Sequence, residues 1–100
     1  MPLSIRQHAQ YEGQDYWKWG VRLDGTPEEL DAVHHVMYIL HPTFNKPVRE
    51  IYDRTSNFSM ETGGWGTFTL LAKVVFKDGH DEVLKHDLEL AYPDKTPAPA

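Results

Sequence analysis

The chain of 100 residues contains no cysteine. A chain without thiols has no disulfide framework, no zinc–thiolate site and no thiol nucleophile, and this composition fits a reducing compartment. No apolar run approaches the roughly 20 residues that a membrane-spanning helix needs, and residues 1–10 lack the apolar centre of a signal peptide. We therefore expect a protein with no membrane segment that works inside the cell, in the cytoplasm or the nucleus.

Clusters of lysine and arginine are also missing. The chain carries 10 basic and 15 acidic residues, a net charge of −5, and the basic ones are scattered. Binding to a phosphate backbone requires a concentrated basic surface, so we expect no nucleic-acid partner. A basic partner, such as a lysine-bearing polypeptide tail, suits the acidic balance better.

The usual signatures of enzymes and metal sites are absent from the sequence. There is no G-x-S-x-G element and no phosphate-binding glycine loop, so we expect no enzymatic activity and no cofactor. Among six histidines, His34 and His35 are adjacent and should point to opposite faces of a strand, where they cannot share a metal. His86 falls on the inward row of a predicted strand, which is typical of a hydrogen-bonded core histidine. We predict no metal site.

What the sequence does contain is a series of short alternating segments. Trp17, Trp19, Val21 and Leu23 share one face of a predicted strand, and a longer strand ends at the turn signal Asp78-Gly79. Strands are expected over residues 4–11, 17–23, 33–40, 47–52, 58–60, 67–76 and 84–90, and one helical turn over 26–29.

This pattern predicts an all-β fold, namely an immunoglobulin-like antiparallel β-sandwich of about seven to eight strands. The sandwich is expected to occupy residues 1–93. Residues 94–100, which are rich in proline and alanine, are expected to form a linker or tail, so the domain is expected to be part of a longer chain.

Two stretches stand out as candidates for a binding site. Gly63 to Phe68 places Trp65 among three glycines, a composition that lets the backbone take φ > 0 or approach a ligand closely. His41 to Phe44 follows a central strand, so both stretches are expected at one end of the sandwich. The alternative is structural: Trp65 plugs the end of the sandwich, Phe44 and Phe68 are core residues, and Thr43 caps a turn.

Spaced motifs in these stretches resemble the YEATS domain family. The residues that carry the resemblance are Val36-x-Tyr38-x-Leu40-His41-Pro42-Thr43-Phe44-x-x-Pro47-x-Arg49, then Phe58-x-x-Glu61-x-x-Gly64-Trp65-Gly66-x-Phe68, with Trp19-x-Val21-x-Leu23-x-Gly25 before them and His86-x-Leu88-x-Leu90 after them. The order and spacing hold over residues 17–90. Related domains also occur in prokaryotes, so a prokaryotic member fits the resemblance.

The resemblance implies a module that reads acylated lysine, acetyl or crotonyl. By position, Phe44 and Trp65 would sandwich the flat amide, the Thr43 hydroxyl would bond to it, and the Trp65 backbone N–H would donate to the acyl carbonyl. His41, Gly64, Gly66 and Phe68 would shape the pocket. The family's further aromatic before the first core strand has only Tyr16 and Trp17 as candidates, and Thr67 stands where many relatives carry Glu or Gly.

Two other functions remain open at this point. The sandwich could hold a partner domain without recognising acyl-lysine, or the site could take another flat ligand. The partner implied by the resemblance is a peptide or protein that carries an acylated lysine.

Overall fold

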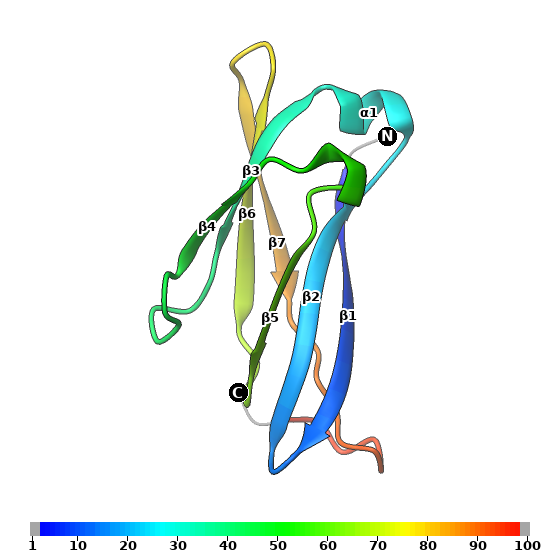
Figure 1. Ribbon diagram of the computed structural model, residues 1–100, viewed down its shortest axis with the longest axis vertical. Coiled ribbons are helices and arrows are strands. Elements are labelled where there is room, and N and C mark those ends of the chain that lie inside the picture. The colour runs from blue at the N-terminus through cyan, green and yellow to red at the C-terminus, as the bar shows by residue number, and fades with distance from the viewer. Residues whose placement is uncertain (1–2, 99–100) are drawn as a thin grey trace.

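Two antiparallel sheets pack face to face in the computed structural model, which describes residues 3–98 (Figure 1). One sheet has the strand order β1-β2-β5 and the other β4-β3-β6-β7. The elements of the described chain are β1 (Ser4–Gly13), β2 (Tyr16–Asp24), α1 (Pro27–Asp31), β3 (Val33–Ile39), β4 (Val48–Ile51), the 3₁₀ turn η1 (Arg54–Ser56), β5 (Met60–Gly64), β6 (Thr69–Phe76) and β7 (Asp81–Asp87). The predicted all-β sandwich is confirmed.

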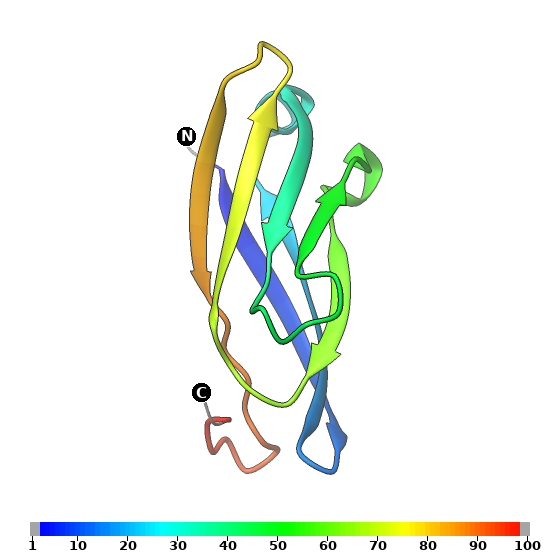
Figure 2. The same ribbon diagram turned by 90° about the vertical axis from the view of Figure 1, so that its left-hand side faces the viewer.

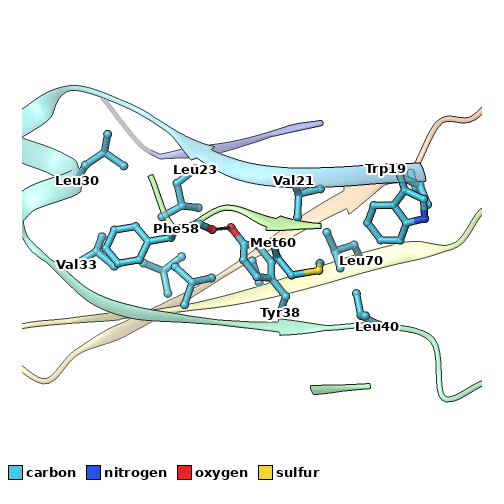
Figure 3. Packing of buried hydrophobic residues seen from close by; sticks show 14 of the residues in the cluster. Trp19, Val21, Leu23, Leu30, Val33, Tyr38, Leu40, Phe58, Met60 and Leu70 are labelled. Atoms are coloured by element: carbon cyan, nitrogen blue, oxygen red, sulfur yellow. Dashed lines mark hydrogen bonds between the residues drawn. The ribbon is translucent and has the colours of Figure 1, made fainter. Parts of the chain in front are cut away.

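Alternating side chains from the two sheets form the core between them (Figure 3). β2 contributes Trp19 and Val21, and β6 contributes Leu70, all fully buried. Tyr38 of β3 is also buried, and its hydroxyl donates a hydrogen bond of 2.6 Å to the backbone oxygen of Phe58. Burial raises the pKa of the Tyr38 phenol well above its usual range, so this group remains a neutral donor.

The predicted local signals appear where the sequence places them. Thr26 caps α1 with a reciprocal capping box, in which its side chain accepts from the Glu29 N–H and the Glu29 carboxylate accepts from the Thr26 N–H. At the β6–β7 hairpin, Gly79 has φ 97° and Asp78 accepts from the His80 backbone N–H at 2.9 Å. Within residues 3–98, no helix has the length and apolar character to span a bilayer.

The expected strand over residues 58–60 is wrong in its position. β5 begins only at Met60, because η1 precedes it and both Asn57 and Phe58 take the left-handed conformation with φ 58°. The strand instead continues through Gly63 and Gly64, which pair with Lys18 and Trp17 of β2. The first half of the glycine-rich stretch is therefore strand and not loop.

The expectation that His34 and His35 point to opposite faces is also wrong. The register between β3 and β6 shifts between Val33 and His35, which indicates a β-bulge. The two Nδ1 atoms consequently lie 2.8 Å apart, and His35 stacks on Tyr52. Within residues 3–98, no group of three or more His, Cys, Asp or Glu side chains is arranged to hold a metal.

The two long edges of the sandwich differ. Along the edge formed by β1 and the chain beyond β7, the Gln7 side chain donates to the Glu89 carbonyl at 2.6 Å and accepts from the Glu89 N–H at 3.0 Å. The same Gln7 oxygen lies 2.6 Å from Nε2 of His86, which is partly buried and hydrogen-bonded as predicted. The opposite edge lies between β4 and β5 (Figure 2), and its lower end carries the loops described below.

After β7 the chain packs across the end of the three-stranded sheet. The buried Trp17 indole N–H donates to the Ala91 carbonyl at 2.8 Å, and Ala91 forms an antiparallel bridge with Pro97. The linker over residues 94–100 stays a prediction: residues 94–98 form a turn that folds back on 90–92, and 99–100 lie outside the described residues.

Candidate ligand-binding site

The loop between β3 and β4 and the loop between β5 and β6 together enclose one cavity of about 480 Å³. All seven residues predicted for a site line it: His41, Thr43, Phe44, Gly64, Trp65, Gly66 and Phe68. Five further residues complete the lining: Asn45, Arg49, Thr62, Gly63 and Thr67. The structure thus brings together two stretches separated by some twenty positions in the chain.

Local hydrogen bonds fix the conformation of the loop that follows β3. His41 Nδ1 accepts from the Thr43 backbone N–H at 3.2 Å and lies 2.9 Å from the Thr43 hydroxyl, and the Phe44 N–H donates to the His41 carbonyl at 3.0 Å. Since Nδ1 accepts from the backbone, the neutral ring carries its proton on Nε2. The Thr43 hydroxyl then donates to Nδ1, which leaves its own oxygen able to accept a further hydrogen bond.

Two of the rings that line the cavity, Phe44 and Phe68, also pack against the core. Phe44 contacts Phe68 with ring centroids 5.4 Å apart, and both rings meet the buried Trp19 at 6.2 and 5.8 Å. Phe68 is half-buried, so it packs against the core and lines the cavity as well. The structural interpretation of Phe68 is therefore confirmed, and its role in binding stays a prediction.

Trp65 lines the cavity from the β5–β6 loop. Its side chain is 70% exposed, so the alternative that it plugs the end of the sandwich is wrong. The ladder between β5 and β2 ends at Gly64. The Trp65 N–H therefore lies just beyond the last paired residue, at the rim of the cavity.

The glycines of this stretch act through their lack of a side chain. Among the described glycines only Gly13 and Gly79 have positive φ, so the left-handed backbone considered for residues 63–66 is not used. A Cβ on Gly63 would collide with the hydroxyl end of the Tyr16 side chain. A Cβ on Gly64 would lie 3.5 Å from Phe44 Cζ, in ordinary contact with the edge of that ring.

The charge lining the cavity is of one sign. Arg49 is its one permanently charged residue, and no carboxylate is among the twelve residues that line it. The Arg49 guanidinium donates to the backbone oxygens of Lys46 and Asn45 at 3.1 and 3.0 Å. Arg49 therefore holds the loop after Phe44 and gives the cavity a positive environment in an acidic protein.

Arg49 belongs to the sequence motif but was not predicted as a site residue. Its place in the cavity depends on the fold, because β4 turns the Arg49 side chain toward β5, where Nη1 lies 3.9 Å from Met60 Sδ.

The two candidates for a further pocket aromatic, Tyr16 and Trp17, do not line this cavity. Trp17 is buried and packs against Tyr92, and Tyr16 lies over Gly63 and lines a different hollow.

A comparison with family models matches residues 17–89 to the prokaryotic YEATS domain. The match covers most of the chain. The protein belongs to the prokaryotic YEATS domain family. No curated protein gives a significant sequence match.

Solved YEATS domains share the fold. The Yaf9 YEATS domain recognising an H3K122suc peptide is 21% identical, covers 95% of this chain and 72% of its own, and has a TM-score of 0.66. The Yaf9 YEATS domain bound to H3K27ac is 22% identical over 90% and 70% of the two chains, with a TM-score of 0.69. The yeast AF-9 homolog protein Yaf9 is 22% identical over 92% and 66%, also with a TM-score of 0.69. At this identity the likeness establishes the sandwich.

Proposed function

We propose that this YEATS domain is a non-enzymatic binding module that reads acylated lysine in a peptide or protein. The observation that carries the proposal is the cavity lined by Phe44 and the exposed Trp65, together with hydrogen-bonding groups and no carboxylate. The solved Yaf9 domains, in complex with H3K27ac and H3K122suc peptides, support the same ligand class.

The proposed binding mode follows from the groups on each wall. The planar amide enters between Phe44 and the Trp65 indole. Its N–H donates to the Thr43 oxygen, which is oriented by the hydrogen bond to His41. Its carbonyl accepts from the Trp65 backbone N–H. His41, Gly64, Gly66 and Phe68 set the depth and width of the cavity.

The cavity discriminates against unmodified lysine by charge. Burying an ammonium costs several kcal/mol, a cation–π contact returns only about 0.5–2 kcal/mol, and Arg49 adds repulsion. Each buried methylene of an acyl group contributes about 0.8 kcal/mol, and each hydrogen bond about 0.5–1.5 kcal/mol. After the cost of association, we expect dissociation constants of micromolar order or weaker.

The direct experiment is a titration with a panel of peptides that differ only in one lysine: unmodified, acetylated, butyrylated, crotonylated and succinylated. Binding is followed by calorimetry and by the fluorescence of Trp65, the exposed indole. We expect binding of at least one acyl form and none of the unmodified peptide. Trp65→Ala should abolish the response while circular dichroism shows an unchanged fold, because the side chain lies outside the core.

Tyr52→Ala is the matched control, since Tyr52 is an exposed aromatic (57%) that does not line the cavity. This variant should bind like the parent protein. Failure of every acyl peptide at millimolar concentration, with the fold intact, would overturn the proposal and favour a sandwich that docks a partner domain.

A further inference from the structure

A second hollow also has Trp65 in its lining. It has a volume of about 450 Å³ and is lined by Gln14, Asp15, Tyr16, Trp65 and Tyr92. The β1–β2 turn, the β5–β6 loop and the segment after β7 meet at this end of the sandwich (Figures 1 and 2). Trp65 is thus a wall shared with the acyl-lysine cavity.

Packing fixes the aromatic faces of this hollow. Tyr16 lies over Gly63, which has no side chain to prevent that approach. The Tyr92 ring is held edge-on by Trp17 at 4.9 Å and by Tyr11 at 5.4 Å. Tyr16 (40%) and Trp65 (70%) nevertheless remain open to solvent, so their faces are available to a ligand.

One carboxylate sits among these rings. The Tyr92 hydroxyl donates to Asp15 Oδ1 at 2.8 Å, and the Asp15 backbone N–H donates to the Tyr11 hydroxyl at 3.2 Å. The hydrogen bond to Asp15 raises the pKa of the Tyr92 phenol, so Tyr92 stays a neutral donor. No lysine, arginine or histidine is among the five residues that line the hollow.

A carboxylate surrounded by tyrosine and tryptophan faces attracts a cation. The aromatic faces supply cation–π attraction and the carboxylate supplies a charge-assisted hydrogen bond. An anion would meet the charge of Asp15, and a purely apolar group would leave Asp15 without a charged partner. The net charge of −5 for the whole chain acts in the same direction.

We infer that this hollow binds the side chain of a lysine or arginine that neighbours the acylated lysine in the same polypeptide. The inference rests on the proposed function, because only a peptide already held in the first cavity presents its neighbouring residue across Trp65. The two sites would then select a basic sequence context: the acyl-lysine cavity excludes a cation, and the hollow beside it takes one.

The test uses three acyl-lysine peptides that are identical except for the residues flanking the modified lysine, which are arginine, alanine or glutamate. We expect the arginine peptide to bind about three- to tenfold more tightly than the alanine peptide, and the glutamate peptide to bind least. The preference should weaken as salt is raised. Equal binding of the three peptides would overturn the inference and leave the proposed function standing.

Asp15→Asn is the decisive variant. Asparagine accepts the Tyr92 hydrogen bond and tolerates the left-handed backbone of Asp15, φ 58°, so the hollow keeps its shape and loses its charge. We expect this variant to lose the arginine preference and to bind the alanine peptide unchanged. Glu12→Gln is the control: it removes one negative charge from the same hairpin at a residue that does not line the hollow, and it should keep the preference for the arginine peptide. Loss of the preference in both variants would indicate a general charge effect and overturn the assignment.

A separate probe distinguishes failure of the hollow from failure of the acyl-lysine proposal. Nα-acetylarginine amide should shift the NMR signals of Tyr92 and of the Trp65 indole in the parent protein and not in Asp15→Asn. If no acyl peptide binds and this probe still shifts those signals, the proposed function fails and the cation site stands. If the probe produces no shift, or the same shift in Asp15→Asn, the cation site fails.

Discussion

The buried phenol of Tyr38 connects two parts of the fold. Its ring fills the space between the sheets, and its hydroxyl satisfies the Phe58 carbonyl, which belongs to a residue held at φ 58° before β5 (Figure 3). The bond therefore joins β3 to the irregular segment that leads into the candidate site.

Tyr38→Phe should destabilise the domain by about 1–2 kcal/mol, because the Phe58 carbonyl would remain buried without its donor. Urea denaturation measures the change. Tyr52→Phe is the control, since the Tyr52 hydroxyl donates at 3.2 Å to Glu50 on the exposed surface. An equal effect in both variants would show that the buried bond has no special weight.

Gly64 offers a second prediction at the scale of one residue. In Gly64→Ala the new methyl group would make ordinary contacts at 3.5 and 3.8 Å, so the stability should change by less than about 1 kcal/mol. Because Gly64 lines the cavity, the methyl group would take up space beside the edge of Phe44, and we expect acyl-lysine affinity to fall roughly tenfold. Calorimetric titration and thermal unfolding of the same sample separate the two effects; unchanged affinity would place the ligand elsewhere.

The β6–β7 hairpin carries the clearest electrostatic contribution of a single element. Asp78 accepts from the backbone N–H of His80, which lowers its pKa, and the His80 ring lies 2.5 Å from the same carboxylate, which raises the pKa of His80. The ring also stacks on Phe76 with centroids 4.2 Å apart. Both charged forms are therefore favoured in the folded hairpin.

The sign of the pH dependence follows from these two directions. The Asp78 contribution is present above the ordinary pKa of 3.8 and is lost as the pH falls through its lowered value. The His80 contribution is present below the ordinary pKa of 6.5 and is lost as the pH rises through its raised value. The turn should stabilise the fold most between about pH 4 and 6.5.

Urea denaturation at pH 5.5 and pH 8.5 tests this window. The loss of stability between the two pH values should be smaller in Asp78→Asn, which keeps the ring stack and removes the nearer of the two carboxylates that His80 meets, the other being Glu82 at 3.5 Å. Because both groups are exposed, the effect is expected to be small and to shrink in high salt. The same pH difference in the variant and the parent protein would rule out a contribution from this pair.

Sequence patterns were most informative where an element repeats with a regular period. The alternation in β2 and β6 and the capping box at Thr26 depend on neighbours along the chain, so they could be read directly. The bulge before His35 and the left-handed Phe58 could not, because tertiary packing and not local composition determines them. The predicted strand over residues 58–60 does not reach Gly63 for the same reason: the residue that pairs with Gly63, Lys18, is distant in sequence.

The candidate site was predicted unevenly. The resemblance to the YEATS family pointed to seven of the residues that line the first cavity, because the family's motifs fall in the two loops that form it. It missed the contribution of Arg49, which depends on how β4 faces β5. It also missed the second hollow, since the Asp15–Tyr92 bond joins residues 77 positions apart.

At the scale of the whole molecule, the two edges of the sandwich have different roles. One edge is closed by Gln7, whose amide joins β1 to the backbone of Glu89 and to His86. The other edge, between β4 and β5, leads to the candidate cavity (Figure 2). Stability and ligand binding should therefore respond to different edges.

Gln7→Ala should lower the free energy of unfolding by about 1–3 kcal/mol, because the Glu89 N–H and carbonyl and the His86 ring would all lose their partner. Affinity for an acyl-lysine peptide should be unchanged at a temperature where the variant is folded. Gln10→Ala, an exposed position on the same strand, is the control for strand propensity. A loss of affinity in Gln7→Ala would mean that the two edges are coupled.

The hydrogen bond from Trp17 to Ala91 has a practical consequence for anyone who shortens this protein. The family match stops at residue 89. Just beyond it, the Ala91 carbonyl accepts a hydrogen bond from the Trp17 indole, which is 1% exposed, and the Tyr92 ring packs against that indole. A version trimmed to the matched region would leave that indole nitrogen without an acceptor and strip a wall from the hollow beside Trp65. Expression boundaries for binding studies should extend at least through the bridge to Pro97.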